Sequence, residues 1–244
     1  MARVCVVTGS RAEYGLLRPV MQAIERSDEC ELCLVVAGMH LSHEFGDTYR
    51  EIEKDGFHAG ARVDMTFSGD SHAAMAKGIG IGIYGISQAL ESLTADIVLV
   101  LGDRTEAFAG AVSGAAMNKI VAHIHGGEVT RGGLDESMRH AITKLSHIHF
   151  VATEGSRRRV LEMGELPESV VVSGAPGLDS ILNQKLYDRD EQSRRLHIPL
   201  RRPRILLVQH SVSTQADGAA EKNAGKVQNA IGGVKDAVRD AVKK

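Results

Sequence analysis

The sequence has few aromatic residues and no tryptophan, since aromatics make up 4% of its 244 residues. Recognition of single strands or glycans by stacking on aromatic rings therefore has little material. An excess of one charge is also missing, because 29 Lys and Arg stand against 31 Asp and Glu, for a formal net charge of −2. Nucleic-acid and membrane-surface proteins usually carry a clear basic excess, so the composition argues against both classes.

Cysteine is scarce, and long apolar runs are missing. The three cysteines, Cys5, Cys30 and Cys33, have no spacing typical of a disulfide framework, which indicates a reducing compartment and a cytoplasmic protein. The apolar run that follows Met1 is too short for a signal peptide. No stretch approaches the roughly 20 apolar residues that span a bilayer. With 43% hydrophobic and 25% charged residues, the chain has the composition of a globular protein.

Short apolar runs alternate with helical patterns over the first two-thirds of the chain. The runs that predict strands cover residues 4–8, 32–37, 96–101, 120–124, 149–152 and 170–173. The intervening patterns predict helices over residues 14–26, 45–55, 105–117, 136–146 and 155–163. Several strands are continuous apolar runs, as expected when both faces of a sheet are covered. The alternation predicts a Rossmann-like α/β fold with a parallel sheet and right-handed crossovers.

One segment fits this alternation less simply. Residues 78–85 read Gly-Ile-Gly-Ile-Gly-Ile-Tyr-Gly, a period of two that by itself favours a strand. Each glycine inside a helix also costs about 1 kcal/mol relative to alanine. The segment nevertheless lies in a long stretch between His72 and Leu93 that has no turn signal of its own. We therefore predict a helix, whose glycines would let a backbone or a ligand approach one face closely.

The composition shifts in the last quarter of the chain. Residues 185–204 contain seven basic and three acidic residues and almost no core pattern, which predicts a linker. A strand-like run follows at residues 205–209 and ends at His210. The sequence thus predicts a Rossmann-like N-terminal domain over residues 1–184. Residues 185–215 would form the linker and the first strand of a truncated second domain.

The remaining residues, 216–244, carry apolar side chains at spacings of three and four. This is the pattern of a C-terminal amphipathic helix, with its stripe at Val227, Ile231, Val234, Val238 and Val242. A solvated helix with one weakly apolar face is the simplest interpretation, and a membrane-surface or partner-binding helix is the alternative. The amino-acid sequence of residues 224–236 also resembles the small CsbD-like stress proteins, which indicates a separate helical tail.

Small turns and charged side chains follow the predicted strands. Ligands of open α/β sheets bind at the carboxyl ends of the strands, so these positions are the candidates for a site. Residues 8–15 form a turn into a helix that starts near Arg11. Backbone N–H groups together with a guanidinium suit a diphosphate. Asp103 follows the next strand of the sheet, where it is either an acid–base group or the cap of a helix.

Two histidines, two glycines and a carboxylate crowd the end of the strand predicted at residues 120–124. His123 and His125 are two residues apart, which predicts that they share one face of a strand, and Glu128 follows them. Acid–base chemistry and a metal site are the two alternatives. No cysteine is near, and no ligand set of known spacing is present, so the pattern disfavours a metal.

Five motifs lie in order along the chain, at residues 8–17, 38–46, 102–106, 123–150 and 173–179. Together they resemble the hydrolysing UDP-N-acetylglucosamine 2-epimerases of the sialic-acid pathway, over residues 2–215. The resemblance implies the N-terminal half of a GT-B-like fold of two Rossmann domains. It also implies a reaction that eliminates UDP from a UDP-2-acetamido sugar and adds water to give the 2-epimeric free sugar, with no metal or NAD consumed.

By motif position, the resemblance assigns acid–base roles to Asp103 and Asp135. It assigns a further catalytic role to His210, at the start of the second domain. The substrate-binding residues that it implies are Arg11, Glu13, His40, Arg104 and Arg139. Carboxylates at strand ends can move a proton at C2 of the sugar and activate water, and a guanidinium can stabilise the departing diphosphate.

The chain departs from the family pattern at His125, where many members have a carboxylate. A histidine still transfers protons near neutral pH, and Glu128 is the alternative acid–base group nearby. The histidine variant resembles the branch that acts on UDP-2,4-diacetamido-2,4,6-trideoxyglucose (UDP-diacetylbacillosamine) of the legionaminic-acid route. The sequence therefore leaves two sugars open, UDP-N-acetylglucosamine and UDP-diacetylbacillosamine.

The family's second domain, which supplies most contacts to the nucleotide, is missing after about Val212. Half a cleft controls water poorly, so we expect little turnover by this chain alone. The apolar surface left exposed would favour a homodimer. Three functions compete: an epimerase, which the motifs favour; an inactive remnant that binds a UDP-sugar; and a GT-B glycosyltransferase, which Asp103 and Asp135 disfavour. We predict no nucleic-acid partner and no membrane span.

Overall fold

The computed structural model describes residues 1–67, 71–130, 134–183 and 187–197. Clustering of the chain gives two compact units, of which the first spans residues 1–131 and 135–185 and contains the sheet. The predicted strand at residues 205–209, His210 and the predicted amphipathic tail lie outside the described residues. No helix in the described part of the chain is long and apolar enough to cross a membrane.

Seven strands form one parallel sheet, in the order β3-β2-β1-β4-β5-β6-β7. Their bounds are β1 (Ala2–Thr8), β2 (Cys30–Ala37), β3 (Ala61–Val63), β4 (Ile97–Leu101), β5 (Ile120–Ile124), β6 (Ile148–Val151) and β7 (Val170–Val172). The predicted Rossmann-like α/β fold is confirmed, and six of the strands lie where the apolar runs predict them. No apolar run predicted β3, a three-residue strand at the edge of the sheet.

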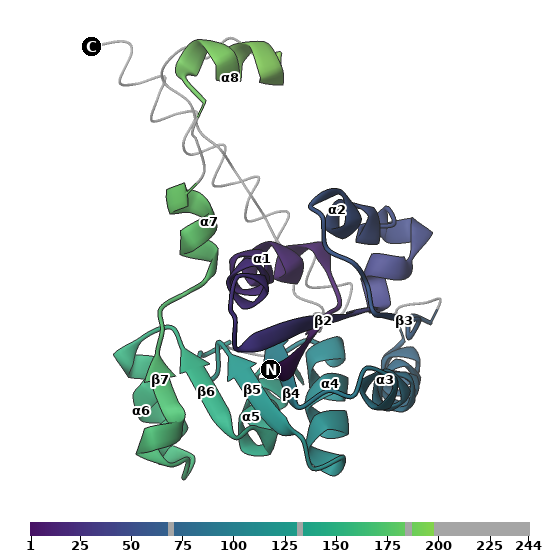
Figure 1. Ribbon diagram of the computed structural model, residues 1–244, viewed down its shortest axis with the longest axis vertical. Helices are drawn as coiled ribbons and strands as arrows, with labels where there is room; N and C mark the ends of the chain where they lie inside the picture. The colour runs from purple at the N-terminus through teal and green to yellow at the C-terminus, as the bar shows by residue number, and fades with distance from the viewer. Residues whose placement is uncertain (68–70, 131–133, 184–186, 198–244) are drawn as a thin grey trace, which may run out of the picture. The chain divides into compact units, whose positions relative to one another are not determined.

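Successive residues of the central strands bury their side chains on opposite faces of the sheet. In β1, Val4 and Val6 pack into the apolar cluster that includes Leu17 of α1. Cys5 and Val7 pack into the cluster that includes residues of α3 and α4. Since both faces are covered by helices, the strands have to be apolar at every position. Figure 1 shows α1 and α3 on the two sides of the strands.

The helices connect the strands in chain order. They are α1 (Arg11–Glu25), α2 (Tyr49–Lys54), α3 (His72–Ser92), α4 (Thr105–Ala116), α5 (Leu134–Leu145), α6 (Glu154–Glu162), α7 (Gly177–Asn183) and α8 (Arg189–Leu196), with short 3₁₀ turns η1 (Gly38–Leu41), η2 (His43–Phe45) and η3 (Pro167–Ser169). Helix α8 lies inside the stretch that the composition predicts as a linker. Its N-cap is Asp188, whose side chain accepts a hydrogen bond from the Glu191 backbone N–H at 2.8 Å.

The glycine-rich segment is helical, as predicted, and forms the centre of α3. A Cβ atom on Gly78 would lie 2.8 Å from the Met65 carbonyl oxygen, and one on Gly82 would lie 2.6 Å from the Met65 side chain. These glycines let the segment after β3 pack directly against the helix. The close approach explains why a helix tolerates residues that weaken it when they stand alone.

The chain order reverses at β1, whose neighbours in the sheet are β2 and β4. In open α/β folds, the crevice at such a switch point, beyond the carboxyl ends of the strands, is where ligands bind. Here the loops that leave β1, β4 and β5 carry Gly9, Asp103 and His125 to this edge of the sheet. The topology therefore brings the predicted site motifs to one edge.

Candidate active site

Asp103 and Arg139 form the centre of one polar cluster at this edge. Asp103 lies in the turn after β4, and Arg139 comes from the second turn of α5. The Arg139 Nη2 atom forms an ion pair with Asp103 Oδ2. The Arg139 side chain is 8% exposed and that of Asp103 is 21% exposed, so solvent reaches the carboxylate more readily than the guanidinium. Burial raises the pKa of Asp103, and the Arg139 charge opposes that rise.

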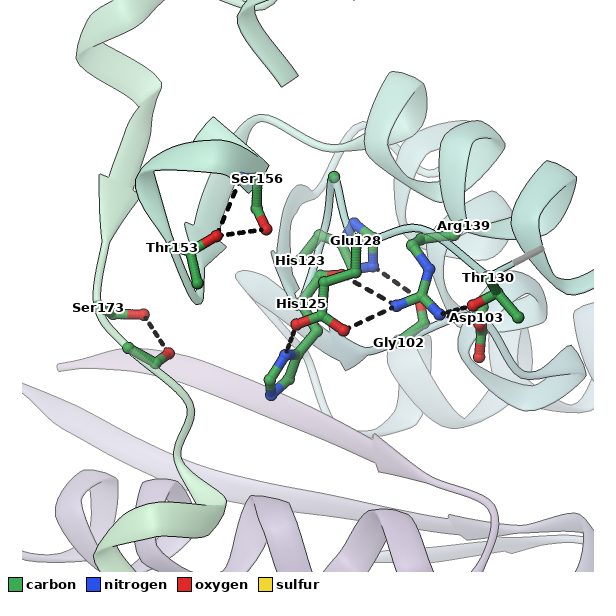
Figure 2. Close-up of polar contacts among 12 residues, drawn as sticks. Gly102, Asp103, His123, His125, Glu128, Thr130, Arg139, Thr153, Ser156 and Ser173 are labelled. Atoms are coloured by element: carbon green, nitrogen blue, oxygen red, sulfur yellow. Dashed lines mark hydrogen bonds and ion pairs between the residues drawn. The ribbon is translucent and has the colours of Figure 1, made fainter. Parts of the chain in front are cut away.

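Arg139 also holds the loop that follows β5. Its Nη1 atom donates a hydrogen bond to the His125 carbonyl oxygen at 3.2 Å, and its Nη2 atom donates to Thr130 Oγ1 at 3.0 Å. Nη1 lies 3.6 Å from Glu128 Oε2. Figure 2 shows the guanidinium between Glu128 on one side and Asp103 with Thr130 on the other. We call Asp103, His125, Glu128 and Arg139 the Asp103 cluster.

His125 and Glu128 are paired within this cluster. The His125 Nδ1 atom lies 2.5 Å from Glu128 Oε1. The hydrogen bond from His125 lowers the pKa of Glu128 below its usual range. His125 has a left-handed backbone, with φ of 66°, and it follows the last residue of β5. Because of this turn, His125 does not continue the alternating side-chain directions of β5.

His123 has a different environment from His125. It is fully buried in β5, where its Nε2–H donates to the Gly102 carbonyl oxygen at 2.8 Å. Burial lowers its pKa to about 3, so it stays neutral. The prediction that the two histidines share one strand face is wrong, because the chain leaves the strand with a left-handed residue at His125. No group of three or more His, Cys, Asp or Glu side chains suited to a metal was found among the described residues.

Asp135 lies in the first turn of α5, one helical turn before Arg139. It is partly exposed, and its charge contributes to raising the pKa of Asp103. Asp135 is thus within electrostatic reach of Asp103, and its acid–base role stays a prediction.

A second polar cluster lies under the loops that leave β1 and β2. Glu13 and Glu106 are each 3% exposed. Glu13 Oε2 accepts a hydrogen bond from the Gly9 backbone N–H at 2.7 Å, while its Oε1 atom has no hydrogen-bond partner among the described residues. Burial first, and the Glu106 charge second, raise the pKa of Glu13 to about 8. Glu13 is therefore protonated over much of the neutral range.

Glu106 joins three loops of the site. A Cβ atom on Gly9 would lie 2.3 Å from Glu106 Cγ, and one on Gly38 would lie 2.2 Å from Glu106 Oε1. Arg104 Nε is 3.4 Å from Glu106 Oε2, and the Arg104 Nη2 atom lies 2.9 Å from the sulfur of Met39. The glycines after β1 and β2 thus make room for a carboxylate from α4.

His40 lies in the same buried layer. It is fully buried, with its Nε2 atom 3.1 Å from Thr8 Oγ1 and its Nδ1 atom 2.7 Å from Thr48 Oγ1. Burial lowers the pKa of His40 to about 4. Both ring nitrogens are occupied by hydroxyl groups of the chain itself. We call Glu13, His40, Arg104 and Glu106 the Glu106 cluster.

Arg11 is the most exposed of the predicted site residues in the described part of the chain. Its side chain is 71% exposed, and its Nε atom lies 2.9 Å from Glu51 Oε2. It is the first residue of α1, whose N-cap is Ser10. An exposed guanidinium at the start of a helix is suited to an anionic group.

The structure therefore divides the predicted site residues between two clusters. Asp103, His125, Glu128 and Arg139 are brought together, with Asp135 close by. Glu13 and His40 belong to the buried layer, and Arg104, whose side chain is 40% exposed, pairs with Glu106 at its border. His210 lies outside the described residues. Glu106 and Thr130 were missed by sequence reasoning. The signal for Glu106 was the pair of glycines, Gly9 and Gly38, that follow two strands; Thr130 had no signal.

Comparison with known proteins identifies the family. The family described as UDP-N-acetylglucosamine 2-epimerase matches residues 22–239. The chain belongs to the UDP-N-acetylglucosamine 2-epimerase family. It is 40% identical, over 229 residues, to the UDP-N,N'-diacetylbacillosamine 2-epimerase (hydrolyzing) of Legionella pneumophila, in a match that covers 94% of this chain and 60% of that relative. It is 36% identical, over 216 residues, to the UDP-N-acetylglucosamine 2-epimerase of Neisseria meningitidis serogroup B, covering 88% of this chain and 56% of the relative.

Solved structures of the epimerase family share the fold. The crystal structure of UDP-GlcNAc 2-epimerase from Neisseria meningitidis aligns with a TM-score of 0.64 at 23% identity, covering 80% of this chain and 52% of that one. The chain thus spans little more than half the length of the relatives it matches. The half that it shares with them contains the Asp103 cluster.

Proposed function

We propose that this chain carries acid–base chemistry of a hydrolysing UDP-sugar 2-epimerase. The observation that carries the proposal is the Asp103 cluster at the switch point of the sheet. It combines a carboxylate of raised pKa, a buried guanidinium and a histidine paired to a second carboxylate. Groups of this kind, at this place in an α/β fold, are suited to removing and returning protons.

The reaction has two proton-dependent stages. Elimination removes the hydrogen on C2 of the sugar as a proton, its electron pair forms the C1–C2 double bond, and the C1–O bond to UDP breaks. Addition of water then places a hydroxyl group on C1 and a proton on the opposite face of C2. Asp103, Asp135 and His125 with Glu128 provide the groups that exchange these protons. Arg11 and the N-terminus of α1 provide the cation and N–H groups that stabilise the departing diphosphate.

Two UDP-sugars fit the proposal, and the sequence identities to the relatives rank one above the other. The Legionella pneumophila relative at 40% identity is named for UDP-N,N'-diacetylbacillosamine. The Neisseria meningitidis relative at 36% identity is named for UDP-N-acetylglucosamine. The histidine at position 125 supports the diacetamido sugar, because the sequence predicts that branch for the histidine variant. Both sugars carry the same 2-acetamido group at the reacting end, so a direct comparison of the rates of UDP release decides between them.

The test is release of UDP from each of the two nucleotide sugars by the purified chain. We expect Asp103→Asn to lower the rate by on the order of 10²- to 10⁴-fold, because a positioned acid–base group contributes that much. Asp28→Asn is the matched control, since Asp28 is exposed and lies at the far end of α1 from the site. Unchanged release by Asp103→Asn would overturn the assignment of Asp103.

A second function is binding of a UDP-sugar without turnover. The observation that favours it is the exposed Arg11 guanidinium at the N-terminus of α1, which suits a diphosphate without help from the acid–base groups. Absence of UDP release from folded protein, together with saturable binding of UDP in calorimetry, would support this function over the epimerase. The catalytic role of His210 and the CsbD-like nature of the tail remain part of the proposal, because both lie outside the described residues.

Location and assembly complete the proposal. Cys5, Cys30 and Cys33 are free thiols, as suits a protein of the reducing cytoplasm. Cys5 and Cys33 are register partners in neighbouring strands and still form no disulfide. We propose a cytoplasmic homodimer, and light scattering of the purified chain measures its mass directly.

A further inference from the structure

The pairing of His125 with Glu128 fixes where the histidine proton lies. Glu128 Oε1 is 2.5 Å from His125 Nδ1, and Glu128 Oε2 is 3.6 Å from Arg139 Nη1. The hydrogen bond from His125 lowers the pKa of Glu128, and the Arg139 charge lowers it further. Glu128 is therefore ionised near neutral pH. An ionised carboxylate only accepts hydrogen bonds, so the hydrogen must be on Nδ1 of the ring.

The other ring nitrogen then has a free lone pair. In a neutral imidazole with hydrogen on Nδ1, the Nε2 atom is the acceptor. His125 Nε2 has no hydrogen-bond partner among the described residues, although the side chain is only 12% exposed. Its neighbour in sequence, His123, has both nitrogens near partners of the chain, at the Gly102 carbonyl and Thr143 Oγ1. Of these two histidines at the end of β5, His125 is therefore the one with an unpartnered ring nitrogen among the described residues.

The backbone of His125 is held in an uncommon conformation by the same groups. Its φ of 66° is left-handed, a region that residues other than glycine rarely adopt. Its N–H donates to the Phe150 carbonyl at 3.0 Å, and its carbonyl accepts from Arg139 at 3.2 Å. Such conformations persist where surrounding contacts fix them, and they gather at functional sites. Three contacts, two to the backbone and one to the ring, therefore fix the direction of the imidazole.

We propose that the Nε2 atom of His125 is the catalytic proton acceptor of this site, and that Glu128 is a positioning residue that holds the ring and its tautomer. The proposal rests on the proposed function for its substrate, a UDP-2-acetamido sugar. It assigns different roles to two residues that the sequence left as alternatives for one role. Glu128 is excluded from proton transfer because one of its oxygens accepts from His125 and the other faces Arg139.

The proton transfer is balanced within the pair. In the elimination, Nε2 takes the proton from C2, the electrons of the C–H bond form the C1–C2 double bond, and the C1–O bond breaks so that UDP leaves with its electron pair. In the addition, Nε2 takes a proton from water, whose bonding electrons stay on the oxygen. The new N–H bond makes an imidazolium that keeps its Nδ1–H toward the Glu128 carboxylate. The positive charge is stabilised by that carboxylate and is lost when Nε2 returns the proton.

Nitrogen-15 NMR of histidine-labelled protein tests the tautomer without any substrate. His125→Gln assigns the signals by removing one ring. We expect the neutral His125 ring of the wild type to have hydrogen on Nδ1 and none on Nε2. We expect Glu128→Gln to mix or reverse the tautomers, since an amide can also donate to Nδ1. Hydrogen on Nε2 in the wild type, or an unchanged tautomer in Glu128→Gln, would overturn the assignment.

Activity adds a second readout. If the wild type releases UDP, Glu128→Gln should lower kcat by about 10- to 100-fold, the usual effect of removing an orienting partner, with KM changed less than about threefold. His125→Gln should lower kcat further. Glu154→Gln, whose carboxylate is 74% exposed in the first turn of α6, is the charge-matched control. Equal kcat values in Glu128→Gln and Glu154→Gln would contradict the positioning role.

The NMR measurement and the activity assay test the two proposals independently. If the wild type releases no UDP but shows the expected tautomer that Glu128→Gln disturbs, the proposed function fails for this chain and the positioning role of Glu128 stands. If UDP and the 2-epimeric free sugar are both released and the tautomer is reversed, the epimerase stands and Nε2 is not the acceptor. The NMR measurement therefore decides the proposal whichever way the activity assay turns out.

Discussion

Two polar clusters lie at the same edge of the sheet and differ in the exposure of their carboxylates. Glu13 and Glu106 are each 3% exposed, although the Arg104 side chain beside them is 40% exposed. In the Asp103 cluster, Asp103 is 21% and Glu128 is 36% exposed. The first cluster binds loops of the chain to one another through Gly9 and Gly38. The second offers a carboxylate and an unoccupied imidazole nitrogen. Under the proposed function, the Glu106 cluster supports the site and the Asp103 cluster performs its chemistry.

The largest change in stability is expected when Arg139 is removed. Arg139→Ala leaves Asp103 and Glu128 partly buried without their cation, which costs about 3 kcal/mol of unfolding free energy. Urea unfolding measures it. Arg18→Ala is the control, because Arg18 pairs with Asp55 at 3.1 Å but is 46% exposed, and an exposed pair contributes about 0–1 kcal/mol. Equal losses in the two variants would show that Arg139 is an ordinary surface cation.

The glycine after β1 should matter nearly as much. Gly9→Ala places a Cβ atom 2.3 Å from Glu106 Cγ, so the buried carboxylate has to move, at a cost of about 1–3 kcal/mol. Gly80→Ala is the matched control, since nothing lies within 4 Å of a Cβ atom at that position of α3. It should stabilise the helix by about 0.5–1 kcal/mol. If both substitutions had the same sign, the close packing around Glu106 would be refuted.

Glu13 should give the Glu106 cluster a distinctive dependence on pH. Its pKa is raised from the ordinary 4.5 to about 8, so the folded state keeps a proton that the unfolded chain has lost. Stability is therefore full below about pH 4.5 and falls as the pH rises toward 8. Glu13→Gln keeps the shape and cannot ionise. The variant should gain on the wild type by about 1 kcal/mol or more between pH 5 and pH 8.

Urea unfolding at both pH values measures this gain. Glu154→Gln, an exposed carboxylate, is the reference that should follow the wild type. Parallel curves for Glu13→Gln and the wild type would mean that Glu13 is ionised in the folded protein. The comparison of the clusters would then lose its main distinction.

The sequence predicted most of the sheet because strands that are covered on both faces are apolar at every position. It missed β3, whose three residues, Ala61–Val63, lie at the sheet edge and include an exposed arginine. Residues 78–85 are helical as predicted. Gly78 and Gly82 face Met65 and Gly85 faces Val63, a packing reason that pattern alone does not show. Helix α8 was missed because none of its residues is buried, and a helix without an apolar stripe has no periodic signal.

Strand ends and the family resemblance pointed to Asp103, His125, Glu128 and Arg139, and the fold brings these four together, while their roles stay predictions. The resemblance gives Arg139 a substrate-binding role, and the sequence carried no signal for its ion pair with Asp103. The prediction that His123 and His125 share one strand face was wrong because His125 has a left-handed backbone. A left-handed residue other than glycine leaves no signal in the sequence. Ion pairs between residues far apart in the sequence, and turns of the backbone at single residues, can be seen only in the folded chain.

The most direct test of the central claim is to run the reaction in D₂O and examine C2 of the released sugar by NMR. The claim is that the Asp103 cluster removes a proton from C2 of a UDP-2-acetamido sugar and that a proton from solvent replaces it. We predict a free sugar with inverted configuration at C2 and one deuterium on that carbon. A free sugar that keeps its configuration and its hydrogen at C2 would show simple hydrolysis of the sugar–phosphate bond and would contradict the account.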